Sequence, residues 1–242
     1  MFPYGAPLSD DLREFLAKAR AQRSTTASAA ARVLSLDELH MRGGHERSPE
    51  PWGLAALRGR LVELSARGAV ATLTTAIDIV LEAQREAEPV AWIVPWTTDA
   101  RTPSGTFYPP DVSDGGVDLS ALVVVRAPTA IAATRSAERL LRSGAFGLVV
   151  LDFGSAGAEL GRLPEHFLGR LVTLAQAHDA AIVCLTEKTQ ESSSLGSLVS
   201  LRAEALRTRT RDGFEITVRA LKDKRRGPGW SRATKARGPA GL

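Results

Sequence analysis

Five short, predominantly apolar runs occur along the chain, at residues 61–64, 90–94, 122–125, 148–151 and 181–185. Each run has the length of a strand, and a predominantly apolar run of this length is typical of a strand that is buried on both faces of a sheet. Stretches with the spacing of amphipathic helices separate most of the runs. The pattern therefore predicts an α/β fold, a mostly parallel sheet flanked by helices.

A helix is expected directly after the first run. Pro89 ends it, because proline disfavours a helical residue before it. Two further helices are expected, one from a Thr129 cap to Gly144 and one over residues 164–177. The apolar residues that share one face of the first helix are Leu73, Ile77, Val80 and Leu81.

The pattern changes towards the C-terminus. Apolar and polar residues alternate over residues 199–205 and again over 214–218, which is typical of half-buried strands, and Asp212-Gly213 between them is a hairpin signal. We therefore expect an antiparallel C-terminal hairpin extension of the sheet. Residues 97–116 are rich in Pro, Gly, Asp and Thr, which predicts a loop whose aromatic pair folds back on the core.

Composition divides the chain into three parts. Residues 1–51 are expected to form an N-terminal helical segment and linker, residues 52–221 the α/β core, and residues 222–242 a basic, flexible tail. The N-terminal segment contains a short amphipathic helix at residues 11–23. A short helix of this kind needs a surface for its apolar face, either on its own body or on a neighbouring molecule.

Charge is unevenly distributed along the chain, whose net charge is +4. From residue 219 to the C-terminus, eight Lys or Arg residues stand against one Asp, a net +7, so the preceding part carries about −3. Cations around an indole can neutralise phosphates and stack on a base, which predicts non-specific binding of single-stranded DNA. Docking of a protein partner and simple solubilisation are the alternatives. The candidate residues, with three arginines of the expected hairpin, are Arg207, Arg209, Arg211, Lys222, Lys224, Arg225, Arg226, Trp230, Arg232, Lys235 and Arg237.

The loop of small residues at 65–71 stands where an α/β fold places its phosphate-binding turn. A working loop reads G-x-x-x-x-G-K-[ST], in which backbone amides wrap the phosphates, lysine meets the β/γ oxygens and the hydroxyl holds magnesium. Ala66 and Ala71 stand at the two glycines, Thr72 at the lysine and Leu73 at the hydroxyl. The sequence therefore predicts a degenerate nucleotide site without ATPase activity, formed by Ala66, Arg67, Gly68, Ala71, Thr72, Thr74 and Asp152.

Other features limit the chemistry and the compartment. The single cysteine, Cys184, lies in an apolar run and is expected to be an inert buried thiol, which suits a reducing compartment. His40 and His45 lack companion ligands at metal-site spacing, so neither a metal nor a cofactor is predicted. No signal peptide and no apolar run of membrane-spanning length is visible, so a cytoplasmic protein without membrane contact is expected.

In this order, the elements resemble the core of RecA-type ATPases over residues 52–229. The Walker A strand, loop and helix resemble GRLVELSARGAVATLTTAIDIVLEAQRE, and the Walker B strand resembles SGAFGLVVLDFGSAG, with Asp152 at the acidic position. AAIVCLTEKTQ resembles the strand that leads to the second DNA-binding loop, and ITVRALKDKRRGPG resembles a late lysine-containing strand and turn. The resemblance implies a RecA-like fold.

Within that superfamily the chain is most similar to the ImuA family, also called the SulA-like or translesion-synthesis-associated group, in its size, degenerate nucleotide loop and basic end. Members work with ImuB, a Y-family-like protein, and an error-prone C-family polymerase in SOS mutagenesis. The resemblance implies a non-catalytic mutasome adaptor that links an ImuB-like protein, RecA and DNA, contacts the polymerase indirectly and joins the nucleoid on DNA damage. It also implies self-association or RecA contact through Leu12, Phe15 and Leu16.

Two alternatives remain open. A recombinase-type DNA-dependent ATPase would need an unusual loop, because Thr72 stands where lysine belongs and residues 95–97 stand where RecA has its water-activating glutamate. The second alternative is a SulA-like cell-division inhibitor, which also has a RecA-like fold without ATPase activity. The N-terminal helix and the basic tail of this chain agree less well with that family. The segment between residues 185 and 199 is short and resembles only a stub of the DNA-binding loop.

Overall fold

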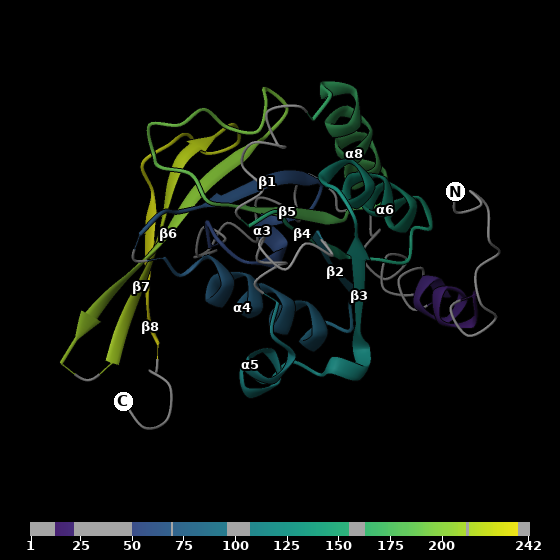
Figure 1. Ribbon diagram of the computed structural model, residues 1–242, viewed down its shortest axis with the longest axis horizontal. Helices are drawn as coiled ribbons and strands as arrows, with labels where there is room; N and C mark the ends of the chain where they lie inside the picture. Colours follow the sequence, from purple (N-terminus) through teal and green to yellow (C-terminus); the bar gives the residue numbers. More distant parts are fainter. Residues whose placement is uncertain are drawn as a thin grey trace, which may run out of the picture.

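Figure 1 shows a computed structural model of the protein, which describes residues 13–21, 50–68, 70–95, 107–154, 163–211 and 213–236. These residues contain one sheet with the strand order β3-β2-β4-β5-β1-β6-β7-β8. The strands are β1 Arg60–Ser65, β2 Val90–Pro95, β3 Leu122–Ala127, β4 Leu148–Asp152, β5 Ala181–Thr186, β6 Leu201–Thr210, β7 Gly213–Asp223 and β8 Ser231–Ala236.

Strands β1 to β6 run in one direction. β1 pairs in parallel with β5 and β6, β2 pairs in parallel with β3 and β4, and β4 pairs in parallel with β5. β7 runs antiparallel to both β6 and β8. Each of the five apolar runs forms a strand of the parallel part. The predicted α/β architecture, a mostly parallel sheet with an antiparallel C-terminal extension, is confirmed.

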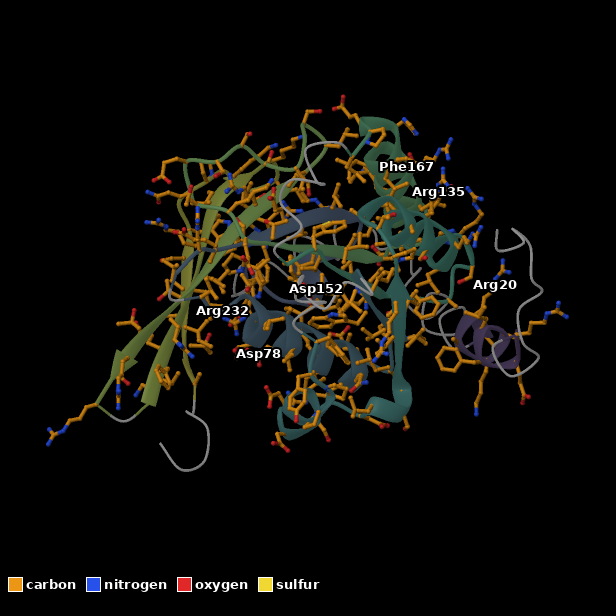
Figure 2. The ribbon with its side chains drawn as sticks, viewed as in Figure 1. Arg20, Asp78, Arg135, Asp152, Phe167 and Arg232 are labelled. Atoms are coloured by element: carbon orange, nitrogen blue, oxygen red, sulfur yellow. The ribbon has the colours of Figure 1, made fainter. Side chains whose placement is uncertain are left out.

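Helices cover both faces of this sheet. α4 and α5 lie on one side, and α6 and α8 lie on the other (Figure 1). Arg135 of α6 lies over the Phe167 ring of α8, 5.6 Å from its centroid, where the two helices pack together (Figure 2). The predicted Thr129 cap is confirmed, because its hydroxyl accepts a hydrogen bond from Ala132 N at 3.1 Å. The helices are α3 Leu54–Leu57, α4 Thr72–Arg85, α5 Pro109–Asp114, the short 3-10 helix η1 Leu119–Ala121, α6 Ala130–Arg142 and α8 Glu165–Ala177.

The apolar face predicted for α4 does pack against the core: Val80 is fully buried, and Leu73, Ile77 and Leu81 are half-buried against the same cluster. The residues of α4 that are fully buried also include Thr75, Ala76, Ile79 and Ala83, which the pattern did not single out. Small side chains face the sheet because they let the helix approach it closely. The run at 122–125 forms β3, which is the edge strand at one end of the described sheet. Buried and more exposed residues alternate along β3, so this strand is not buried on both faces as the sequence predicted.

The loop predicted over residues 97–116 is partly helical. Residues 109–114 form α5, which begins with two prolines, residues that suit the first turn of a helix. Phe107 packs against Trp92 of β2, with ring centroids 5.4 Å apart, so this aromatic residue does fold back on the core. Tyr108 beside it is 59% exposed.

The C-terminal part corrects a second expectation. Residues 222–236 are not a flexible tail: β7 continues to Asp223, a turn follows, and residues 231–236 form β8. Trp230 packs against the core cluster on the α4 side and donates its indole N–H to Asp223 Oδ2 at 3.0 Å. Its ring is therefore part of the fold, which disfavours the expected stacking on a base. Arg237 lies outside the described residues.

The N-terminal helix is described over residues 13–21. Ala19 is buried, and Phe15 and Leu16 are half-buried against the apolar cluster beneath α6 and α8. Phe15 and Phe146 have ring centroids 6.4 Å apart. The apolar face predicted for self-association thus packs on the protein's own body. Leu12, the linker and the histidines at 40 and 45 lie outside the described residues.

Candidate functional site

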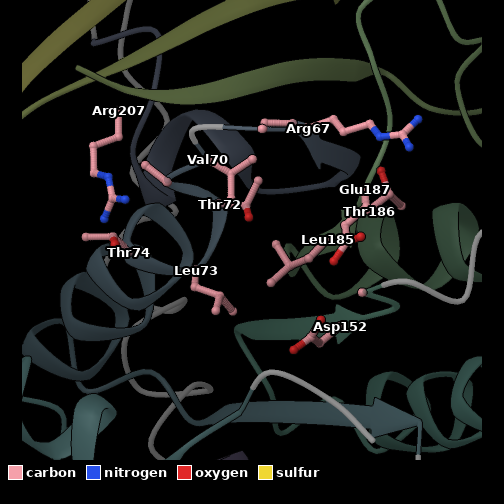
Figure 3. Close-up of a pocket in the computed structure, with 14 residues that line it drawn as sticks. Arg67, Val70, Thr72, Leu73, Thr74, Asp152, Leu185, Thr186, Glu187 and Arg207 are labelled. Atoms are coloured by element: carbon pink, nitrogen blue, oxygen red, sulfur yellow. The ribbon is translucent and has the colours of Figure 1, made fainter. Parts of the chain in front are cut away.

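The candidate site is a pocket of about 410 Å³ at the carboxyl ends of β1, β4 and β5. These three strands are adjacent in the sheet, and the carboxyl ends of parallel strands are where open α/β sheets bind ligands. Asp152 ends β4 near the middle of the molecule (Figure 2). Figure 3 shows the pocket, whose lining includes the seven predicted residues of the degenerate site, Ala66, Arg67, Gly68, Ala71, Thr72, Thr74 and Asp152.

The loop that leads into α4 is attached to β6. The Ala71 N–H donates to Ala205 O at 3.0 Å, and Val70 forms an antiparallel bridge with Leu206. In a working phosphate-binding loop, amides of this segment point at the phosphates. Here the amide at the position of the second glycine is already bonded to a carbonyl of a neighbouring strand. The backbone therefore differs from a phosphate cradle, not only the side chains.

Positive charge reaches the pocket from two arginines. Arg67 comes from the loop and Arg207 from β6, whereas Thr72 stands at the start of α4 (Figure 3). The guanidinium of Arg207 lies over the ring of Phe214, 4.8 Å from its centroid. Lys188, just beyond the pocket, forms an ion pair with the carboxylate of Glu63 at 3.0 Å. No described lysine lines the pocket.

The acid of the candidate site is Asp152, which is only 2% exposed at the end of β4. It lies beside Leu185 of β5 in the strand register. Glu187 also lines the pocket. Among the described residues, no three His, Cys, Asp or Glu side chains gather as ligands for a metal ion.

Sequence reasoning missed a buried glutamate beneath the pocket. Glu63, in the middle of β1, is fully buried and accepts hydrogen bonds from Thr186 Oγ1 at 3.0 Å and from Leu195 N at 2.8 Å. Burial, followed by the charge of Glu63, raises the pKa of the neighbouring Cys184 thiol, so this thiol stays protonated. The signal was present: one glutamate interrupts an otherwise apolar strand, and buried charges need partners.

Arg202 of β6 holds the same segment from a second strand. It is 4% exposed, donates to Thr189 O at 2.6 Å and to Ser192 O, and contacts Ser65 Oγ at 3.3 Å. Residues 187–199, the segment that resembles a stub of a DNA-binding loop, are therefore fastened to β1 and β6. Two buried charges fix this segment beside the pocket.

The residues predicted to bind nucleic acid fall into separate groups. A ribbon group consists of Arg207 and Arg209 at the outer end of β6 and Arg211 in the turn that follows the strand. A turn group, Lys222, Lys224, Arg225 and Arg226, lies at the end of β7, where Lys222 pairs with Arg202 near the start of β6. Arg232 of β8 is engaged by Glu50 at 3.0 Å and by Trp52 O at 2.9 Å, and Lys235 is exposed on the same strand. The structure does not join these cations into one surface.

Comparisons with known proteins give no family. No protein-family model matches the chain, and no curated protein matches its sequence. None of the described helices has both the length and the apolar character needed to cross a membrane.

Proposed function

We propose that the protein is a non-catalytic, RecA-like accessory protein of SOS-induced translesion DNA synthesis. In this role it joins an ImuB-like protein, RecA and DNA, with the error-prone C-family polymerase reached indirectly. The arrangement of β1, its loop, α4, β4 and β5 around one pocket supports the RecA-like part of the proposal. The motif order in the sequence supports the family part.

One observation carries the absence of catalysis: the Ala71 amide is bonded to Ala205 O at 3.0 Å, next to a threonine at the lysine position. Phosphoryl transfer depends on positioning the triphosphate and neutralising its charge. A loop fastened to β6 offers fewer amides for this task, and Thr72 offers no charge. Among the described residues that line the pocket, no lysine is available to neutralise a triphosphate.

Hydrolysis measurements test this proposal. We expect the full-length protein to release no phosphate from Mg-ATP above the blank, with or without single-stranded DNA. Asp152→Ala should give the same trace, and a RecA protein in the same buffer serves as the active control. Turnover that Asp152→Ala abolishes would establish a recombinase-type ATPase instead.

The adaptor role needs a separate test. Pull-down with the full-length chain as bait should retain an ImuB-like protein and RecA from the same source. Retention of neither protein contradicts the proposal. Cell filamentation on overexpression, with no change in mutation frequency, would favour a SulA-like division inhibitor over an adaptor.

A further inference from the structure

A second, larger hollow lies on the α4 side of the sheet and shares only Thr74 with the lining of the candidate site. It is a groove of about 1310 Å³ between β7 and β8 on one wall and α3, α4 and α5 on the other. Pockets for small molecules typically measure ~300–1,000 Å³. The size and the strand wall suit a length of polypeptide better than a small ligand.

The strand wall ends in an open edge. β8 is the outermost strand, and among the described residues it pairs only with β7. Ala220 N donates to Trp230 O at 2.9 Å, and bonded pairs alternate along an antiparallel ladder. The backbone groups of Ser231, Ala233 and Lys235 therefore point outward. An unpaired row of this kind accepts an added strand.

The helical wall of the groove carries four acidic residues and one basic residue, Arg85 of α4. Asp78 and Glu82 lie one turn apart on α4, and Asp111 and Asp114 come from α5. Arg232 of β8 lies near Asp78 (Figure 2), but its ion pair is with Glu50 at 3.0 Å. Neither Asp78 nor Glu82 forms an ion pair within the described part of the chain. The wall therefore has spare negative charge.

The carboxyl of Asp78 lies at the exposed mouth of the groove and is partly desolvated. This desolvation raises its pKa in spite of Arg232 and Arg85 nearby. A cation brought into the groove would therefore meet a carboxylate that the chain's own cations have not fully neutralised.

We propose that the groove binds an extended, basic segment of a partner protein. The segment pairs with the outer side of β8 as a ninth strand and directs a Lys or Arg side chain to Asp78 and Glu82. Main-chain hydrogen bonds to β8 supply affinity, and the acidic wall supplies the preference for a cationic sequence. The site stands apart from the proposed adaptor role and does not depend on it.

A labelled peptide tests the site directly. The probe is a fluorescein-labelled peptide of alternating Val and Lys, and its control is the matching Val and Glu peptide, both titrated into the full-length protein by fluorescence anisotropy. We expect the basic peptide to bind at least about tenfold more tightly. Binding should protect the Ala233 amide from hydrogen exchange.

Matched variants separate the two contacts. Ala233→Pro removes the outward N–H and should weaken the basic peptide at least about tenfold, whereas Ala233→Val keeps the N–H and the affinity. Asp78→Asn with Glu82→Gln should erase the preference for the basic peptide, and Glu191→Gln on the far loop should not. Circular dichroism and thermal unfolding confirm that each variant is folded.

Several outcomes would overturn the site. Equal affinity for the basic and the acidic peptide would contradict charge recognition by Asp78 and Glu82. Unchanged affinity of the basic peptide for Ala233→Pro would contradict its pairing with β8 as an added strand. No binding of the basic peptide at saturating concentration rejects the site itself. A mass that doubles with concentration in light scattering, and that Ala233→Pro returns to the monomer, would assign the edge to a second copy of this chain.

Discussion

The Arg60–Asp223 pair shows how single side chains set the C-terminal structure. The Arg60 guanidinium lies 2.6 Å from Asp223 Oδ1, and both side chains are almost completely buried. The same carboxylate accepts hydrogen bonds from Trp230 Nε1 and from the Arg225 amide. Burial opposes ionisation, but the bonds from Arg225, Trp230 and Arg60 together hold the pKa of Asp223 below its ordinary value. One carboxylate therefore fixes the turn that precedes β8.

We predict that Asp223→Asn destabilises the protein by about 3–5 kcal/mol, because it leaves Arg60 buried without its counter-charge. Urea denaturation followed by circular dichroism measures the loss. Asp114→Asn, an exposed acid at the end of α5, is the matched control and should change the free energy of unfolding little. An Asp223→Asn protein as stable as the parent would mean that the pair contributes nothing to β8.

The same carboxylate predicts an acid dependence. Its pKa is lower in the folded than in the unfolded protein, so its contribution is present at neutral pH and is lost as pH falls through the folded pKa, below about 4. The stability difference between the parent and Asp223→Asn should therefore shrink on acidification below about pH 4. Unfolding curves at neutral and acidic pH check the trend. A difference that grows with acid would contradict this sign.

These residue contacts were beyond sequence reasoning. Arg60 and Asp223 are 163 positions apart, and a run of glycines, prolines and cations around Trp230 is typical of a tail. Only the fold brings the partners together, and it turns the expected flexible segment into a strand. The grouping of the seven predicted site residues around one pocket, in contrast, could be predicted, because six of them lie within residues 66–74 and only Asp152 comes from elsewhere.

At the scale of elements, the segment after β5 is held by charges from two strands. Glu63 of β1 binds Leu195 N and Lys188, and Arg202 of β6 binds carbonyl oxygens of Thr189 and Ser192. A segment with such partners opens rarely, because opening exposes two buried charges together. The segment beside the pocket is therefore held in place by the protein's own side chains.

We predict that Glu63→Gln loosens residues 187–199. The side-chain amide of the new glutamine cannot both pair with the Lys188 ammonium and accept from the Leu195 N–H, as the carboxylate of Glu63 does. Because Lys188 can turn to solvent, we expect the free energy of unfolding to fall by only about 1–3 kcal/mol. Hydrogen exchange should quicken at the Leu195 amide, while the amides of β1 stay protected. Glu187→Gln, in the same segment but exposed, is the control. Unchanged exchange at Leu195 would show that Glu63 does not hold the segment.

The sequence predicted which segments form strands and helices more reliably than it predicted how deeply each one is buried. Five apolar runs predicted five parallel strands, since predominantly apolar runs of that length leave few other options. The same pattern could not distinguish the edge strand β3 from a central one. It also favoured the large side chains of α4, although the helix turns Ala76 and Ala83 to the sheet and leaves Ile77 beside α5. The position of β3 at the sheet edge and the face that α4 turns to the sheet both depend on how the elements pack together, which a local sequence pattern does not encode.

At the scale of the molecule, the two basic groups are far apart. The β6–β7 hairpin extends beyond the body (Figure 1), and its exposed outer end carries the ribbon group. From Phe214 to Lys222 β7 covers about 27 Å as an extended strand. One member of the turn group makes a contact within the chain, since Lys224 Nζ donates to Ser197 O at 2.6 Å. Because the two groups lie at opposite ends of β7, we expect them to bind different partners.

We predict that single-stranded DNA binds to the ribbon group and not to the turn group. Arg207 and Arg209 lie two residues apart on β6, so their Cα atoms are about 6.8 Å apart and their side chains share one face of the ribbon, and Arg211 follows in the turn. Neutralising all three to Gln should weaken binding of a fluorescein-labelled oligothymidylate and lower the slope of log K against log salt by about 2. Lys224→Gln with Arg225→Gln and Arg226→Gln removes the same charge and should leave affinity and slope unchanged. If both triple variants lose affinity equally, net charge alone drives binding and the ribbon group has no special role. If only the turn variant loses affinity, DNA binds at the turn group, and the hairpin is available to a protein partner.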